Sequence, residues 1–220
     1  MACFYIRLAF ILLIIPPSLT IVSGQSKNNP DPLKPYTTCK LPGDLKVKEV
    51  TRRPKSVEKY REVTTAKGNE RVSVVDGYRV MFAYKDLFYF FANVKIEQSD
   101  PASYLQDKEK VVNQLKYYSS TKEATGIIYT DKTMLNGFEH YGTDRDKIDV
   151  GGTIGIHVLF YDAGHLIITA YLLNQDDKNT TSVLLGGGRR FHNIDQYRTL
   201  KDDFLSHYSE CLKGVADAQH

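Results

Sequence analysis

The residues of this chain whose types and spacing could do chemistry are mainly histidines, arginines and acids near glycine-rich turns. His157 and His165 flank the turn Asp162-Ala163-Gly164. Two imidazoles on paired strands could ligate a metal ion if His140 or Asp162 came near. A separation of eight positions between the two histidines is not a diagnostic spacing, so we expect sheet-surface histidines and no bound metal. A hydrolase that uses His140 or His157 with a carboxylate is the least favoured function, after the binding protein and the carrier described below.

The stretch GGGRRFHN, residues 186–193, comes directly before a predicted helix. Backbone amides, the helix dipole and the side chains of Arg189, Arg190 and His192 could hold a phosphate, sulfate or carboxylate there. A solvated loop and a prohormone-type processing signal are the alternatives. The stretch TDRDKID, residues 143–149, is interpreted as a turn, because it lacks the glycine and terminal glutamate of an EF-hand calcium loop.

Common enzyme signatures are missing from the sequence. There is no G-x-S-x-G elbow, H-E-x-x-H zinc motif, C-x-x-C pair or Walker loop. We therefore expect a protein that is not an enzyme and needs no cofactor.

The first 24 residues predict a secretory signal peptide. They carry Arg7, the apolar run LAFILLII, a Pro-Pro break and small residues near Gly24. The apolar run of eight residues is well below the roughly 20 that a membrane span needs. We expect a secreted, extracellular protein with no membrane span.

The remaining chain predicts one domain with a proline-rich arm. Residues 25–54 hold five of the eight prolines and form the arm, residues 55–214 form a single α+β domain, and residues 215–220 form a tail. Because Arg7 is the only charged residue of the signal, 28 basic and 26 acidic side chains remain. A balance so close to neutral does not indicate a nucleic-acid partner.

Two modifications follow from a secreted location. Cys3 leaves with the signal peptide, so Cys39 and Cys211 remain as one pair, for which we predict a disulfide. Two free thiols are the alternative. Asn179 begins the sequon Asn-Thr-Thr and is the predicted glycosylation site.

An aromatic stretch, YRVMFAYKDLFYFFANVKIE at residues 78–97, has the period-two pattern of two antiparallel strands that turn at Lys85-Asp86. We expect most of its aromatic side chains in the core and the Asn93 to Glu97 end of one face in water. A pocket would need apolar side chains that no helix covers, and the candidates for such an apolar surface are Met81, Leu87, Tyr89 and Phe91.

Two amphipathic helices are expected to cover this sheet. The first lies within residues 99–120, capped by Asp100, and places Leu105 and Tyr118 on its buried stripe. The second runs from residue 194 to residue 213, capped by Asn193, and ends at Gly214. Strands are predicted in the segments LKVKEVT (45–51), YREVTT (60–65), RVSVV (71–75), GIIYT (126–130), MLNGFEHYGT (134–143), TIGIHVLFY (153–161) and HLIITAYLL (165–173).

This order of elements predicts an α+β protein with an antiparallel β-sheet flanked by two helices. The segments DGYRVMF, SDPASYLQDKEKVVNQL, NGFEHYG and TIGIHVLFYDAGHLIITAYLL, with the terminal helix, are similar to the PsbP-like fold over residues 72–212. In that fold a hairpin and a helix lead into an antiparallel sheet, and a C-terminal helix packs back onto it as an α/β/α sandwich. The resemblance implies binding or accessory roles, and no site residue of the family maps onto this chain.

We therefore expect a secreted, non-enzymatic binding or accessory protein whose partner is an unknown extracellular protein or small ligand. Its contact surface would be the uncovered end of the aromatic sheet or the Arg189-Arg190 loop. The alternative is an extracellular carrier that holds a small hydrophobic molecule in an aromatic-lined cavity.

Overall fold

The computed structural model describes residues 31–43, 45–84, 90–121, 126–147, 152–174 and 193–219. Several predicted features lie outside these residues. They are the signal peptide, the glycosylation site Asn179, the candidate anion-binding residues Arg189, Arg190 and His192, and the apolar candidates Leu87 and Tyr89.

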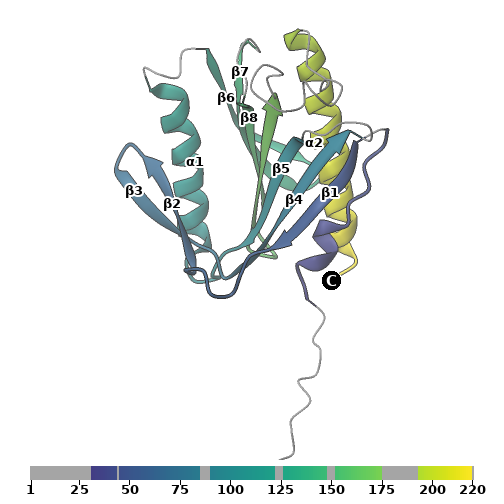
Figure 1. Cartoon of the computed structure of the whole chain (residues 1–220). Coiled ribbons are helices and arrows are strands. Elements are labelled where there is room, and N and C mark those ends of the chain that lie inside the picture. Colours follow the sequence, from purple (N-terminus) through teal and green to yellow (C-terminus); the bar gives the residue numbers. More distant parts are fainter. Residues whose placement is uncertain are drawn as a thin grey trace, which may run out of the picture. The chain divides into compact units, whose positions relative to one another are not determined.

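Seven antiparallel strands form the main sheet, in the order β1-β4-β5-β9-β8-β7-β6 (Figure 1). The strands β8 and β9 are apolar on both faces, and the structure places β9 in the centre of the sheet with β8 beside it, as their sequences predict. The bounds of the seven strands are β1 Leu45–Arg52, β4 Asp76–Tyr84, β5 Phe90–Gln98, β6 Ile127–Leu135, β7 Phe138–Arg145, β8 Gly152–Tyr161 and β9 Leu166–Asn174.

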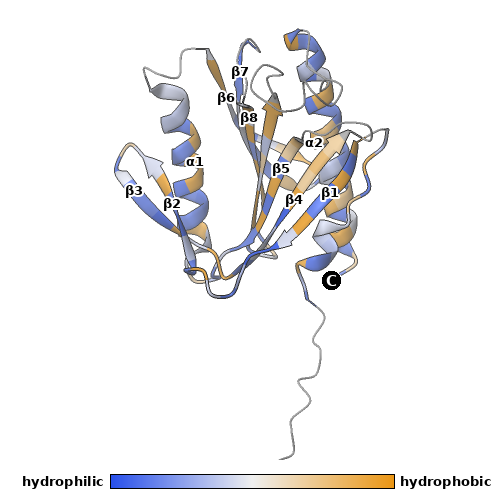
Figure 2. Ribbon diagram, in the orientation of Figure 1, coloured by the Kyte–Doolittle hydropathy of each residue, from blue (hydrophilic) through white to orange (hydrophobic). Residues whose placement is uncertain are grey.

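One face of this sheet packs against the C-terminal helix α2, Ile194–Asp217. Alternate residues of the central strands, such as Val94 and Ile168, point to this face and are fully buried. Phe204 and Tyr208 of α2 contact Phe82 edge to face, with ring centroids 5.5 Å apart in each pair. The apolar residues of the helix thus meet apolar strands. Figure 2 shows hydrophobic residues along both α2 and the strands beside it.

The other face carries a smaller layer. Helix α1, Tyr104–Ser120, packs against a separate two-stranded sheet of β2, Tyr60–Thr65, and β3, Gly68–Ser73, and also contacts β6 and β7. Its core joins Val63 and Val72 of the small sheet to strand residues of the main sheet and to α1, whose buried apolar residues are Tyr104, Val111, Val112 and Leu115. The described chain is therefore α+β, as predicted, with an additional two-stranded sheet that the sequence did not separate from the main one.

The strand predicted across residues 134–143 is instead a tight hairpin. Asn136 and Gly137 have φ values of 49° and 90°, and Leu135 pairs with Phe138 across them. Asn-Gly is the dipeptide that best tolerates two left-handed positions in a two-residue turn. The Asn136 amide also donates hydrogen bonds to the carbonyl of Ser206 and the hydroxyl of Ser209, which tie the turn to α2.

The helix positions require three corrections. The N-cap residue of α1 is Ser103, not Asp100. Leu105 is 73% exposed and Tyr118 is 37% exposed, so neither belongs to the buried stripe of α1. Helix α2 continues through Gly214 to Asp217 because this glycine keeps helical backbone instead of ending the helix. The predicted cap of α2 is confirmed, since Asn193 Oδ1 accepts a hydrogen bond of 2.8 Å from the backbone amide of Gln196.

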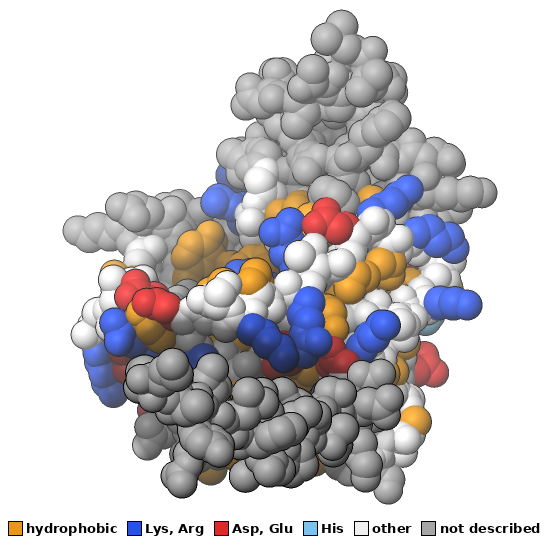
Figure 3. Space-filling model, turned by 60° about the horizontal axis from the view of Figure 1, so that its bottom comes forward, with side chains coloured by type: hydrophobic (Ala, Val, Ile, Leu, Met, Phe, Trp, Pro, Cys, Tyr) orange, Lys and Arg blue, Asp and Glu red, His pale blue; other side chains and the backbone are white. Residues whose placement is uncertain are grey.

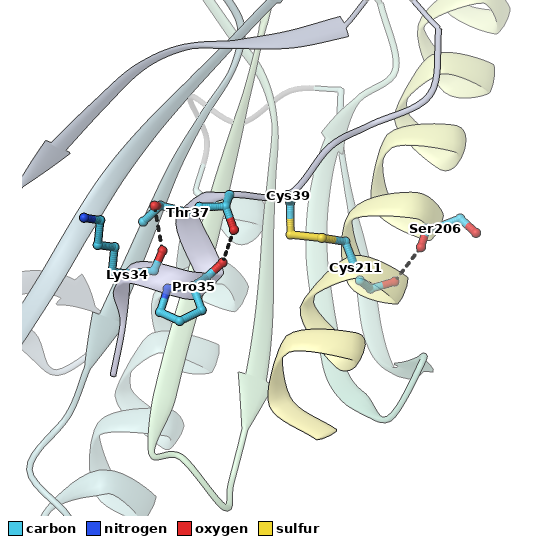
Figure 4. The surroundings of a disulfide bond; sticks show 8 residues. Lys34, Pro35, Thr37, Cys39, Ser206 and Cys211 are labelled. Atoms are coloured by element: carbon cyan, nitrogen blue, oxygen red, sulfur yellow. Dashed lines mark hydrogen bonds between the residues drawn. A yellow bond between two sulfur atoms is a disulfide. The ribbon is translucent and has the colours of Figure 1, made fainter. Parts of the chain in front are cut away.

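The predicted disulfide between Cys39 and Cys211 is confirmed (Figure 4). Cys39 follows a 3-10 helix, η1, Lys34–Thr37, and lies 5.7 Å from Cys211 of α2 between Cα atoms. Leu33 and Tyr36 are buried in the same core as α2. Residues 31–52 of the predicted arm therefore contribute core residues and the edge strand β1 to the folded unit. Among the described helices, none has the length and apolar character to cross a membrane.

Candidate functional site

A cavity of about 600 Å³ lies between α1, β2 and the main sheet. This volume is within the range of pockets that hold a small organic molecule. The residues that line it come from all three elements: Arg61 and Thr64 of β2; Val111, Gln114, Leu115, Tyr117 and Tyr118 of α1, with Thr121 just after it; and Arg145, Ile156, Val158, Thr169 and Tyr171 of the main sheet.

Strand alternation selects the sheet residues that form the floor of this cavity. Ile156 of β8 pairs with Thr143 of β7 on one side and with Tyr171 of β9 on the other, so the three side chains share one face. Val158 and Thr169 pair two residues further along the same strands, so their side chains share this face. The floor is therefore apolar in its centre, with hydroxyl groups beside the apolar residues.

The helix forms the opposite wall. Val111 and Leu115 are four residues apart, are almost fully buried and face the sheet. Gln114 is half-buried, and Tyr117 is 36% exposed. The wall thus changes from apolar residues inside to a polar, aromatic rim.

The charges around the cavity do not balance. Arg61 Nε donates to Glu97 Oε2 at 2.7 Å, and Arg53 approaches the same carboxylate at 4.0 Å. Glu97 is only 5% exposed, so the end of β5 that the sequence analysis placed in water is instead covered. Lys95 lies 5.2 Å from the ring centroid of Tyr171, which lines the cavity.

Arg145 is the second arginine of the cavity, and it differs from Arg61. Its Nε is buried without a hydrogen-bond partner, and no ion pair joins its guanidinium to another residue in the described part of the chain. The lining residues that the structure describes include no carboxylate. Because the Arg61 charge is matched and the Arg145 charge is not, the cavity has a net positive charge.

Unpaired hydroxyl groups lie on the same sheet face. Thr169 is 4% exposed and Thr143 is 2% exposed, and the Oγ1 atom of each is buried without a partner. A further unpaired atom, Asn93 Oδ1, belongs to the residue that pairs with Tyr171. Buried polar atoms are almost always paired in folded proteins, and each unpaired one costs about 1–3 kcal/mol. A group of them beside a cavity is the arrangement expected of a site whose partner is a ligand.

A second polar group lies in the opposite face of the sheet, under α2. Thr133 Oγ1 is 2.8 Å from His140 Nδ1, and His140 Nε2 is 3.1 Å from His157 Nδ1. His157 Nε2 is 3.0 Å from Asp144 Oδ1. Asp144 also accepts hydrogen bonds from the Tyr197 hydroxyl at 2.5 Å and from Lys201 Nζ at 3.0 Å.

The charges of this histidine network, which comprises the six residues from Thr133 to Lys201 just described, are mutually consistent. Burial alone would raise the pKa of Asp144, but the hydrogen bonds from His157 and Tyr197 and the charge of Lys201 outweigh it and hold this pKa well below its usual range. Burial and the neighbouring His157 lower the pKa of His140 to about 3. A neutral His140 has one donor and one acceptor ring nitrogen, so it can hydrogen-bond to both Thr133 and His157.

The geometry of the histidine network indicates a structural role. The two histidines are almost fully buried, and each of their ring nitrogens already has a partner. His165 lies apart from it, against the ring of Tyr104 in α1 at 5.3 Å between centroids. Among the described residues, no group of three or more His, Cys, Asp or Glu side chains is placed to hold a metal.

The predicted apolar surface is not found at the two candidates that the structure describes. Met81 is 5% exposed and Phe91 is 1% exposed. Phe91 packs edge to face on Phe204 of α2, with ring centroids 5.6 Å apart, so it is a core residue.

Sequence reasoning missed Arg145 because it interpreted residues 143–149 as a turn, and it placed Thr143 at the end of a predicted strand without a role. Strand β7 in fact continues to Arg145. The signal was present in the alternation Tyr141, Thr143, Arg145, which continues the period of two beyond the apolar part of the strand. Comparison of the chain with protein-family models, curated proteins and solved structures finds no match.

Proposed function

We propose that this is a secreted, non-enzymatic binding protein that holds one small organic molecule in the cavity between α1 and the main sheet. The observation that carries the proposal is a cavity of about 600 Å³ whose lining combines apolar side chains with an arginine and a threonine that have unpaired polar atoms. A few placed polar groups in a largely apolar hollow are typical of small-molecule sites.

The surrounding architecture supports a carrier. Side chains of Val111, Leu115 and Val158 would contact the apolar body of a ligand, while the tyrosines at the rim would shield it from water. The similarity of the sequence to the PsbP-like fold, an α/β/α sandwich with binding and accessory roles, agrees with a non-catalytic function. The histidine network supports no competing function, because its ring nitrogens are all engaged.

The experiment uses N-phenyl-1-naphthylamine, a neutral probe that becomes fluorescent in apolar surroundings. The purified protein, with its disulfide formed, is titrated with this probe, and we expect saturable binding of about one probe per chain. Gln114→Trp should abolish or strongly weaken binding, because its indole would occupy the cavity beside Leu115.

The matched control is Leu105→Trp, which places the same side chain at a position of α1 that is 73% exposed and does not line the cavity. This variant should bind as the parent does. Because the chain contains no tryptophan, energy transfer from either new indole to the probe also reports its proximity. Absence of saturable binding, or equal binding by both variants, would overturn the proposal.

A further inference from the structure

We propose that the molecule held in this cavity is an amphipathic organic anion whose negative group is bound by Arg145. This inference rests on the proposed function and adds the chemical class of the ligand. The ligand would place its anionic group at the β7 end of the cavity and its apolar body between α1 and the strands β8 and β9. The cavity would also have space for a second polar group of the ligand near Thr169.

The first argument is the difference between the two arginines. The charge of Arg61 is matched by Glu97 at 2.7 Å, so a ligand anion at Arg61 would have to compete with an internal carboxylate. Arg145 has no such competitor in the described part of the chain. A half-buried guanidinium without an acceptor favours a carboxylate or a similar anion, which it can bind through two parallel hydrogen bonds.

The second argument is the sign of the remaining charge around the cavity. The single carboxylate of Glu97 is shared between Arg61 and Arg53. Lys95 adds another cation at the Tyr171 wall. A neutral ligand would leave this positive charge uncompensated, and a cationic ligand would increase it.

The third argument concerns the shape of the site. Thr143 precedes Arg145 by two residues on the same face of β7, and a second, water-sized hollow of about 10 Å³ adjoins both residues and Tyr118. Asp144 also borders this hollow, but its carboxylate bonds to His157, Tyr197 and Lys201. On the sheet, Ile156 and Val158 of the middle strand β8 lie between Arg145 and Thr143 of β7 on one side and Thr169 of β9 on the other. This order suits a molecule with a charged head and an apolar body.

The test compares two probes that share one aromatic skeleton. 8-Anilinonaphthalene-1-sulfonate carries an anionic group that N-phenyl-1-naphthylamine lacks. We expect the sulfonate to bind about tenfold more tightly or better, and we expect dodecanoate to displace it at about tenfold lower concentration than dodecanol. Arg145→Gln should remove at least this tenfold preference without weakening the neutral probe, and Arg145→Lys should restore part of it.

The control for net charge is Arg198→Gln, which removes a 49% exposed guanidinium from α2; it should leave both affinities unchanged. The anion proposal fails, while the proposed function stands, if both probes bind with equal affinity, if Gln114→Trp blocks the binding of both equally, and if Arg145→Gln changes both affinities equally. If neither probe binds, both fail. The sulfonate binding more tightly but independently of Arg145 would also overturn the assignment of Arg145.

Discussion

At the scale of single residues, the histidine network and the cavity differ in how their buried polar groups are paired. In the histidine network every charged or polar atom has a partner, and Asp144 alone accepts three hydrogen bonds. On the α1 face, Arg145 and Thr169 keep unpaired atoms at a similar depth. Because such atoms are destabilising unless paired, the contrast agrees with a structural role for the histidine network and with the proposed ligand at Arg145 and Thr169.

A substitution of Gly142 tests how tightly the histidine network is packed. A methyl group at this position would lie 2.5 Å from His157 Nδ1 and 2.8 Å from His157 Cε1. We expect Gly142→Ala to lower the free energy of unfolding by about 1–3 kcal/mol, because the imidazole has to move away from its hydrogen-bond partners. Gly214→Ala is the control, since nothing lies within 4 Å of its Cβ and alanine favours a helix, so a gain of about 0.5–1 kcal/mol is expected. Guanidinium denaturation measures both changes, and similar effects of the two substitutions would contradict the prediction.

The lowered pKa of His140 predicts that the protein loses stability in weak acid. Burial and His157 lower its pKa in the folded protein to about 3, whereas its unfolded value is about 6.5. Between these values the unfolded chain binds one more proton than the folded one. The free energy of unfolding therefore falls as pH decreases below about 6.5, by about 1.4 kcal/mol per pH unit for this group.

Urea denaturation between pH 7 and pH 5 measures this slope. In this range Asp144 contributes little, because its pKa is lowered and it is ionised in both states. His140→Asn should reduce the slope by the contribution of one proton, whatever its effect on stability at pH 7. An unchanged slope would show that folding does not lower the pKa of His140.

At the scale of elements, Asp107 holds the start of α1 to the strands. Its Oδ2 atom accepts hydrogen bonds from the Ser73 backbone amide at 3.1 Å and from the hydroxyls of Ser73, Ser99 and Ser103 at 2.6, 2.8 and 2.7 Å. Burial alone would raise the pKa of Asp107, but these hydrogen bonds and Lys110 lower it. One carboxylate thus joins the ends of β3 and β5 to the helix that forms a wall of the cavity.

We expect Asp107→Asn to lower the free energy of unfolding by about 3 kcal/mol or more, because an amide would turn a donor towards several hydroxyl donors in a site that is 1% exposed. The control is Asp100→Asn, an exposed acid near the same helix start, which should cost less than about 1 kcal/mol. Thermal and chemical denaturation at pH 7 measure both. Equal effects of the two substitutions would mean that Asp107 is not the anchor.

Local pattern was sufficient to predict most elements and insufficient to predict the cavity. Period-two alternation locates β8 and β9, and Asn193 marks the start of α2, because these signals depend on neighbouring residues only. The cavity depends on how far α1 stands from Ile156 and Thr169, and this is set by the two-stranded sheet that packs on α1. No local sequence pattern specifies the distance between α1 and the main sheet.

At the scale of the whole molecule, one sheet separates a closed side from a hollow side. The closed side holds α2, the larger core and the disulfide, while the hollow side holds α1, the small sheet and the cavity. In Figure 3, Lys and Arg side chains are spread over the face shown, with acidic and apolar residues among them. The closed side thus holds the larger core, and the proposed ligand would lie on the hollow side.

This division predicts that stability and binding respond differently to loss of the disulfide. The bond joins residues 172 positions apart, for which the chain-entropy model gives on the order of 5 kcal/mol and typical native bridges give about 2–5 kcal/mol. We expect the double variant Cys39→Ser, Cys211→Ser to lose stability of this size in guanidinium denaturation. Its affinity for N-phenyl-1-naphthylamine should stay within about twofold of the parent wherever it is folded, because Cys39 and Cys211 pack with α2, on the other face of the sheet from the cavity. A folded double variant that no longer binds the probe would show that the two sides are coupled.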